Sequence, residues 1–471
     1  MAEQELLTTP LTVHGCTRLS SSGEMRAFLS RLVACTAEAR LWPLGFSAGG
    51  RPLTALHLRA LRDDAPLLRV LLVGSQHGAS EAAGGEALLE LARLLSAGEL
   101  SALRAHIEFV IHADANPDGR DADSSRNAED ININRDFVLL TQPETRALDR
   151  LLLEFAPHVV LDAHESAVLK RQSLARQGYM TDFETQFDCG NNPAIPDALR
   201  GFMEDVMLPA LLQRVSARGV RATRYIREIT SLSQALTHGG LTVRKFRNRA
   251  AVGGALAFLL ETRRDPQDGV YDSFRNIAVR SAKQLLAQRV FIDLLAEMRA
   301  PILKLLTSHA ASREAVVLDA CYVPTAADAM LRVPLRAIAD GALADFEFAD
   351  HRRVVAGPPV ALAARYWITA HHATFARLLD AHGFVHRRLD AALCRAVLVQ
   401  PVAGAAHTWP APHQAQRWLA AGTLEVPVSG ARARLLPLLL EPLSGSSVFR
   451  YAAFAGLLPA GADCFVLRDA E

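Results

Sequence analysis

The sequence predicts an α/β fold, in which a mixed, largely parallel open sheet is flanked by helices and is followed by a smaller α+β region. Two observations support this class. Long apolar runs alternate with helical segments in the first part of the chain, and shorter strands and turns follow residue 310. At 471 residues the chain is longer than one typical domain. We therefore expect a main domain at residues 1–308 and a β-rich accessory domain at residues 309–471.

The first strands and the first long helix are predicted from hydrophobic periodicity. Residues 53–61 (LTALHLRAL) alternate as a half-exposed strand does. Residues 67–75 and 107–116 are continuous apolar runs, typical of strands that are covered on both faces. Between them, residues 85–99 carry leucines at helical spacing, and this predicted helix ends near Gly98.

The same alternation continues to the end of the main domain. Residues 143–157 are predicted to form a helix, and residues 158–166 and 255–265 to form two further buried strands. A helix over about residues 271–306 closes the domain. Before these elements lies a long polar loop, residues 115–137, and such loops inside compact α/β domains are frequently functional.

The accessory region has a different pattern. Residues 364–389 indicate a strand, a helix ended by Gly383, and a second strand, and the tail after Gly422 looks β-rich. Four histidines lie here without a carboxylate or cysteine at ligand spacing, so we do not expect them to bind a metal. They are His371, His372, His382 and His386.

Composition excludes several classes of function. Lys and Arg number 51 and Asp and Glu 50, giving a formal net charge of +1, so neither nucleic acid nor a membrane surface is expected as the main partner. The opening residues, MAEQELLTTPLTVHGC, lack an apolar run, which predicts a cytoplasmic protein without a secretory signal or anchor. Six widely spaced cysteines with no Cys-x-x-Cys pair predict reduced, mostly buried thiols.

Polar residues cluster where the predicted strands end, which is where open α/β sheets bind ligands. The clusters are His77 with Glu81, the loop at 115–137, His164, and Glu261. Each has a simpler interpretation alone, such as a hydrogen-bonded histidine at a strand end or a glutamate in the first turn of a helix. Together, a neighbouring His and Glu with one distant His form a three-ligand set typical of catalytic zinc.

The order of these motifs resembles the zinc carboxypeptidases, metallopeptidases that remove a C-terminal residue with one zinc ion and a glutamate base. The resemblance covers about residues 40–300. It is carried by LGFSAGGRPLTALHL, VGSQHGASEAAGGEALL, NPDG, RNAEDININRDF, QPETRAL, VVLDAHE and FLLET, in that order. It implies that the main domain is a zinc carboxypeptidase-like catalytic domain.

The resemblance also implies roles for individual residues. His77, Glu81 and His164 would bind one zinc ion, which lowers the pKa of its bound water and polarises the scissile carbonyl. Glu261 would be the general base. The implied substrate is a peptide or an amino-acid conjugate with a free C-terminal carboxylate.

Three residues of the polar loop receive roles in the same way. Arg126 corresponds to the arginine that stabilises the oxyanion, and Asn134 and Arg135 correspond to the pair that binds the substrate's terminal carboxylate. Without the other motifs, this loop would instead be interpreted as a network of Arg–Asp salt bridges.

The sequence departs from the family pattern in three places. The first two ligands are spaced His-x-x-x-Glu, with Ser80 where the glutamate is expected; a bulge could keep Glu81 on the metal, and Glu86 is the less favoured substitute. Asn132 replaces the usual aspartate beside the first ligand histidine. The stretch before Glu261 offers Phe246 and no tyrosine for the family's substrate-capping position.

Three functions follow from these observations. The favoured one is a zinc metallocarboxypeptidase that hydrolyses the C-terminal amide bond. A second is a zinc-dependent deacylase of N-acyl amino acids, of the aspartoacylase and succinylglutamate desuccinylase type; NPDG and FLLETR favour the peptidase. A third is a catalytically inactive peptide-binding relative, suggested by the three departures and opposed by the retained Glu261 and Arg126.

Overall fold

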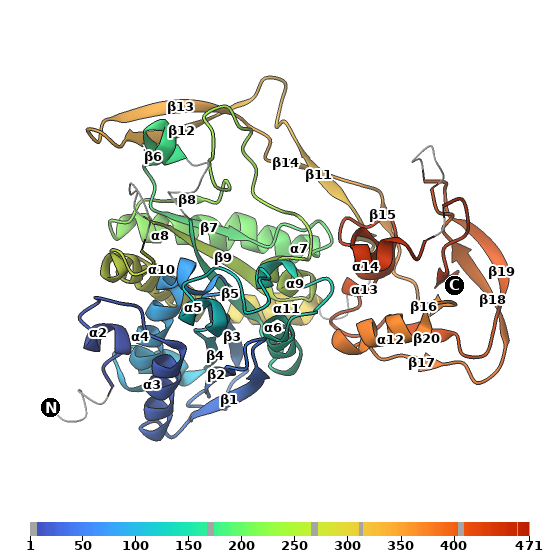
Figure 1. The fold of residues 1–471 in the computed structure, drawn as a ribbon, viewed down its shortest axis with the longest axis horizontal. Helices are drawn as coiled ribbons and strands as arrows, with labels where there is room; N and C mark the ends of the chain where they lie inside the picture. The colour runs from blue at the N-terminus through green and yellow to red at the C-terminus, as the bar shows by residue number, and fades with distance from the viewer. Residues whose placement is uncertain are drawn as a thin grey trace.

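An eight-stranded mixed sheet forms the centre of the molecule in the computed structural model (Figure 1). The structure describes residues 7–166, 174–264, 272–309, 314–403, 409–458 and 460–470. Four of the seven strand pairs in this sheet are parallel, and the other three are antiparallel. In order across the sheet, the strands are β1 (Ala39–Phe46), β2 (Pro52–Leu58), β4 (Ile107–His112), β3 (Leu68–Gly74), β5 (Val159–Ser166), β9 (Leu256–Arg263), β7 (Thr185–Cys189) and β8 (Ala222–Arg224).

The predicted strands of the main domain are present, but the half-exposed character predicted for residues 53–61 is wrong, because five of the seven residues of β2 are buried. The runs that lack alternation became the central strands β4, β3, β5 and β9, and β5 is buried over seven of its eight residues. β2 joins β1 in an antiparallel hairpin at the edge. Continuous apolar runs form central strands because both of their faces are covered by helices.

Helices cover the sheet. α4 (Ala83–Ala97) packs against β3 and β5, α10 (Ile277–Glu297) packs against α4 and α8 (Leu208–Ala217), and α9 (Phe246–Val252) packs against β5 and β9. α4 ends at Gly98, as the sequence predicts. α6 (Pro143–Glu154) begins with a proline, which has no N–H to leave unsatisfied in the first turn.

The closing helix is two helices, which corrects the prediction of one helix over residues 271–306. α10 ends at Glu297, and α11 (Arg299–His309) begins after Met298. Pro301 explains the break, because its nitrogen cannot donate the hydrogen bond that would continue α10. The predicted first residue of this helix, Tyr271, lies outside the described residues.

A hairpin from beyond residue 309 returns to the main domain. β12 (Met330–Ala337) pairs with β13 (Leu343–Ala349), and β12 also pairs with β6 (Tyr179–Thr181) (Figure 1, orange against green). The hairpin has a small hydrophobic core of its own with residues of the main domain. This core contains Leu174, Phe183, Ile226, Ile229, Leu236, Val333, Leu335 and Phe348.

The rest of the accessory region is built on a six-stranded antiparallel sheet. Its strands, in order, are β17 (Arg387–Arg388), β20 (Leu424–Pro427), β16 (Arg365–Ile368), β21 (Val466–Asp469), β18 (Leu393–Val399) and β19 (His413–Leu419). The predicted strand, helix and strand are β16, α12 (His372–Ala381) and β17. The tail also contains helices, α13 (Leu435–Leu440) and α14 (Ala452–Ala455). The predicted domain boundary at residues 308 and 309 stays a prediction.

Two general properties complete the description. All six cysteines are free, but only Cys189 and Cys464 are buried, so the prediction of mostly buried thiols is wrong. Among the helices of the described residues, none is long and apolar enough to cross a bilayer.

Candidate active site

The carboxyl ends of three neighbouring parallel strands bring the candidate residues together. Ala163 on β5 lies opposite Gly74 at the end of β3, and His164 lies opposite Glu261 on β9. His77 follows β3 by three residues. These strand ends border a cavity of about 910 Å³, and the predicted ligands and base all line it. The sheet topology thus brings the predicted ligands and base, which are far apart in the sequence, to one edge of the sheet.

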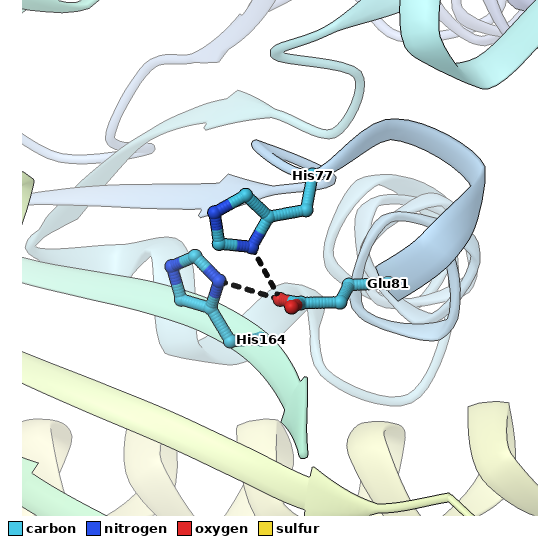
Figure 2. Close-up of side chains that lie close together, drawn as sticks. All are labelled: His77, Glu81 and His164. Carbon is cyan, nitrogen blue, oxygen red and sulfur yellow. Dashed lines mark hydrogen bonds and ion pairs between the residues drawn. The ribbon is translucent and has the colours of Figure 1, made fainter. Parts of the chain in front are cut away.

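Three side chains converge in this cavity to form the candidate metal centre (Figure 2). Oε2 of Glu81 lies 2.8 Å from Nδ1 of His77 and 2.7 Å from Nδ1 of His164. All three potential ligand atoms lie within 4.8 Å of one another. The three side chains therefore face a common point; His77 and Glu81 come from the turn after β3, and His164 comes from β5.

A short 3₁₀ turn accommodates the four-residue spacing from His77 to Glu81. The turn spans Gly78–Glu81, and Gly78 has a φ of +50°. A Cβ at Gly78 would lie 2.5 Å from the backbone of Gly119 and Ser124, so only glycine fits. The extra residue is absorbed by this turn, and the side chain of Glu81 still reaches the two histidines.

Glu86 is fully occupied elsewhere. Its carboxylate binds Arg120 at 3.0 Å and accepts hydrogen bonds from the backbone and hydroxyl of Ser20. Glu86 is 2% exposed and lies inside α4, away from the cavity lining. The geometry therefore favours Glu81 over Glu86 as the carboxylate of the cluster, as the sequence suggested.

The outer nitrogens of both histidines have hydrogen-bond acceptors. Nε2 of His77 lies 3.3 Å from Oδ1 of Asn132, and Nε2 of His164 lies 2.9 Å from Oδ1 of Asp162. Protons on these two Nε2 atoms leave lone pairs on both Nδ1 atoms, pointing at the carboxylate of Glu81. Such a set of two imidazole nitrogens and one carboxylate oxygen is a zinc donor set, and its residues fit one ion with a position left open.

Electrostatics within the cluster follow from these contacts. Burial disfavours the ionised carboxyl of Glu81, but the two imidazoles still hold its pKa well below its ordinary value. Burial likewise disfavours the imidazolium of His164, yet the carboxylates of Asp162 and Glu81 raise its pKa well above the usual value. In the absence of a metal ion, a proton on His164 thus compensates the charge of the carboxylates.

Glu261 lies beside the metal cluster, opposite His164 on the neighbouring strand. The hydroxyl of Ser166 donates a hydrogen bond to its Oε2 at 3.1 Å. Burial and then the nearby carboxylate of Glu81 raise the pKa of Glu261 to about 7. Glu261 is partly buried, and its hydrogen-bond partner among the described residues is Ser166.

Asn134 and Arg135 also line the cavity. Oδ1 of Asn134 accepts a hydrogen bond from the backbone of Phe246 at 3.0 Å, and its Nδ2 lies 3.3 Å from Nε2 of His164. The guanidinium of Arg135 donates to the carbonyl of Asn134 at 2.7 Å. Burial, followed by neighbouring Arg244, lowers the pKa of Arg135. The structure brings this predicted pair close to the metal cluster.

Arg126 is not brought to the cavity, in contrast to the expectation for an oxyanion-binding residue. Its guanidinium donates a hydrogen bond to the backbone carbonyl of Asp130 at 2.7 Å and lies 3.6 Å from the side-chain carboxylate of Asp130. The side chain of Arg126 is 51% exposed. Ser125, the preceding residue, lines the cavity instead. The hydrogen bond to the turn at Asp130, whose φ is +58°, fixes Arg126 away from the site.

Sequence reasoning missed several residues of the cavity wall. Tyr225 and Tyr322 both line it, and Tyr322 comes from β11 (Ala320–Val323), beyond the predicted main domain. The hydroxyl of Tyr322 accepts a hydrogen bond from Asn191 at 3.0 Å. The family pattern places a tyrosine shortly before Glu261, and neither Tyr225 nor Tyr322 lies there. The local sequence around these two tyrosines therefore gives no signal that they line the cavity.

Asp162 is a further missed residue, and here a signal existed. Residues i and i+2 of a strand share a face, so the aspartate in VVLDAHE lies beside His164. A carboxylate in a buried strand requires a polar partner, and Asp162 is 1% exposed. His164 is one polar partner of Asp162. Gln76 is the second, because its side-chain amide donates a hydrogen bond to Asp162 at 2.6 Å.

Part of the chain matches a known family model. Residues 25–152 match the family model described as zinc carboxypeptidase. The matched stretch contains His77, Glu81, Asn134 and Arg135, whereas His164 and Glu261 lie beyond its end.

Several curated carboxypeptidases are similar to the chain over about half of its length. Carboxypeptidase 2 of Trichophyton rubrum is 27% identical over 249 residues, covering 51% of this chain and 46% of the relative. A probable carboxypeptidase 2 of Arthroderma benhamiae is 27% identical over 249 residues, covering 51% and 47%. The chain thus spans about half the length of the curated relatives that it matches.

Solved carboxypeptidases are also similar to the chain. A metallo-carboxypeptidase from Burkholderia cenocepacia has a TM-score of 0.44 at 19% identity, covering 59% of this chain and 70% of that chain. Carboxypeptidase A from Helicoverpa armigera has a TM-score of 0.46 at 15% identity, covering 63% and 81%.

Proposed function

We propose that this protein is a zinc-dependent metallocarboxypeptidase that hydrolyses the C-terminal amide bond of a peptide or amino-acid conjugate. One observation carries the proposal. Two histidine nitrogens and the Glu81 carboxylate converge beside a second, enclosed carboxylate, Glu261, in one large cavity. A metal-ligand set next to a separate proton acceptor is the arrangement that metal-assisted hydrolysis requires.

His77, Glu81 and His164 would hold one zinc ion. When bound, zinc lowers the pKa of a coordinated water and polarises the carbonyl of the scissile bond. Asn132 and Asp162 orient the two imidazoles through their outer nitrogens, so that both Nδ1 atoms are available as ligands. The protein therefore holds its donor atoms ready before any substrate arrives.

Glu261 would act as the general base and then as the general acid. It accepts a proton from the attacking water and delivers it to the nitrogen of the leaving amine. Ser166 orients the carboxylate by donating to Oε2, which leaves Oε1 available to accept the proton. A pKa near neutrality suits both halves of this proton transfer.

Arg135 and Asn134 would bind the terminal carboxylate of the substrate. A guanidinium presents paired N–H groups that match the two oxygens of a carboxylate. The backbone of Phe246 holds the amide of Asn134 in place. Binding the chain end beside the metal cluster restricts hydrolysis to the last amide bond.

The test combines metal analysis with one substitution. The purified protein should bind one zinc ion per chain and cleave short peptides that have a free C-terminus, but not the same peptides amidated at that end. Glu261→Gln should keep the zinc ion and lose activity by roughly 10²- to 10⁴-fold. Glu154→Gln, on the surface of α6 beside Arg150, is the matched control and should retain activity.

Two outcomes would contradict the proposal. Full peptidase activity in Glu261→Gln would exclude the proposed base. Faster turnover of N-acyl amino acids than of short peptides would assign the site to a deacylase instead.

A further inference from the structure

One wall of the cavity is a loop held rigidly by buried asparagines. Residues 237–245 precede α9 and contribute much of this wall. The side-chain amide of Asn192 donates a hydrogen bond to the backbone carbonyl of Leu241 at 2.7 Å. The side-chain amide of Asn248 donates one to the backbone carbonyl of Gly240 at 3.1 Å. Asn192 and Asn248 are 5% and 0% exposed, so water does not compete strongly for these bonds. The backbone of this loop is therefore held in place.

Three cations of this wall lack acidic partners. We call Arg135, Arg244 and Lys245 the basic wall; all three line the cavity. Within the described ranges, none of the three has a carboxylate at ion-pair distance. The neighbouring Arg247 differs, because Asp188 pairs with it at 3.0 Å.

Lys245 is the enclosed member of the basic wall. Arg135, Arg244, Arg247 and Glu261 line the same cavity, and their charges act on Lys245. Burial and then the nearby guanidiniums lower the pKa of its ammonium to about 7. An enclosed ammonium among like charges is unfavourable on its own, and a bound anion would relieve this cost.

The terminal carboxylate of a substrate would pair with only part of the positive charge of the basic wall. In the proposed function, that carboxylate binds Arg135 and Asn134, which leaves Lys245 and Arg244. Arg244 is exposed at the rim, whereas Lys245 lies inside. The loop also presents Thr237, Leu241 and Thr242 to the cavity.

We propose that the enzyme prefers substrates whose C-terminal residue carries a second carboxylate, as aspartate and glutamate do, and that Lys245 is the specificity-determining residue that binds it. This inference rests on the proposed function. Arg135 takes the terminal carboxylate, Lys245 takes the carboxylate of the side chain, and Arg244 attracts the dianionic chain end from the rim.

The experiment uses the zinc-loaded full chain and four blocked dipeptides that differ only in the last residue: Glu, Gln, Leu and Lys. Glu and Gln have the same shape, so their ratio isolates the charge. We expect kcat/KM for Glu to exceed that for Gln by roughly tenfold to a hundredfold, the range of a charge-assisted hydrogen bond. Lys245→Met should reduce the ratio to near one, and Lys245→Arg should keep most of it.

A matched control removes a lysine elsewhere. Lys304→Met, on the exposed face of α11, should leave the Glu to Gln ratio unchanged. Calorimetry with free glutamate and free glutamine provides a readout that does not depend on turnover. Glutamate should bind more tightly, and Lys245→Met should abolish the difference.

The outcomes separate this inference from the proposed function. Cleavage of the Gln or Leu substrate as fast as the Glu substrate would overturn the acidic preference and leave the carboxypeptidase intact. Failure to cleave any of the four, together with tighter binding of glutamate that depends on Lys245, would overturn the proposed function and support the binding role of Lys245.

Discussion

Asp162 and His164 lie two residues apart on β5, and Oδ1 of Asp162 is 2.9 Å from Nε2 of His164. The strand therefore supplies both a candidate ligand and the acceptor that orients it. His77 has only the neutral amide of Asn132 in the corresponding place, at 3.3 Å. At the outer nitrogens of the two histidines, the acceptor that carries a negative charge is Asp162 of β5, whereas Asn132 of the polar loop is neutral.

The first prediction concerns this charge. Asp162→Asn should weaken zinc binding roughly 10- to 100-fold, because the amide orients His164 but no longer raises the basicity of its ring. Competition with a zinc chelator of known affinity measures the effect. The reverse change, Asn132→Asp, should strengthen zinc binding, and equal affinities for all three proteins would show that these outer contacts do not tune the metal.

The second prediction separates Glu81 from Glu86. Glu81→Gln should weaken zinc binding strongly while the fold persists, because the polar partners of Glu81 among the described residues are the two histidines and the backbone of Glu165. Glu86→Gln should do the opposite and keep one zinc ion per chain. Its free energy of unfolding should fall by about 3–5 kcal/mol, because the buried ion pair with Arg120 is broken.

Metal analysis and urea denaturation of the two Glu variants give the two readouts independently. Loss of zinc from Glu86→Gln, with Glu81→Gln still loaded, would reassign the carboxylate ligand and would show that the 3₁₀ turn does not deliver Glu81 to the metal.

The third prediction contrasts two arginines of the polar loop. Arg126→Ala should change kcat/KM by less than about threefold, because its half-exposed guanidinium contacts Asp130 and does not line the cavity. Arg135→Ala should raise KM and lower kcat/KM by roughly 10- to 100-fold, as expected for losing a charged hydrogen bond to the substrate. Steady-state kinetics on one peptide measures both, and a large kcat defect in Arg126→Ala would restore the predicted oxyanion role.

Elements with a clear hydrophobic pattern were predictable from the sequence. The apolar runs at β3, β4, β5 and β9 could be assigned because fully buried strands leave a distinctive pattern. Their shared parallel direction then placed the polar residues at the same edge of the sheet. This is why His77, His164 and Glu261 could be grouped from positions far apart in the chain.

Other features depend on geometry that sequence patterns do not carry. In an irregular loop there is no period that fixes which side chain faces the cavity, so Ser125 rather than Arg126 faces inwards. Tyr322 reaches the cavity through a strand that follows the predicted main domain. Contacts across such separations arise from tertiary packing, and only the structure reveals them.

His382 links the accessory region to the main domain and is the subject of the last prediction. Its Nε2 lies 3.0 Å from the carbonyl of Val138, and Arg432 donates to the carbonyl of His382 while pairing with Asp149 at 2.8 Å. Burial and then the neighbouring guanidinium of Arg249 lower the pKa of His382 to about 3. The histidine is 0% exposed and stays neutral in the folded protein near neutral pH.

This pKa makes the protein less stable in acid. An unfolded histidine has an ordinary pKa of 6.5, so between pH 6.5 and 3 the unfolded chain binds more protons than the folded one. The stability contributed by neutral His382 is thus complete above 6.5 and declines as the pH falls towards 3, by at most about 1.4 kcal/mol per pH unit. Asp149, whose pKa is lowered to about 2 against burial by Arg249 and Arg432, adds its own loss only below 3.8.

Urea denaturation of the metal-free protein from pH 7 to pH 4 measures this dependence. His382→Gln should flatten the decline, because glutamine retains a donor for Val138 and does not titrate. His413→Gln, on exposed β19, is the matched control and should reproduce the slope of the unsubstituted protein. Parallel slopes for all three proteins would mean that His382 is not responsible for the loss of stability in acid.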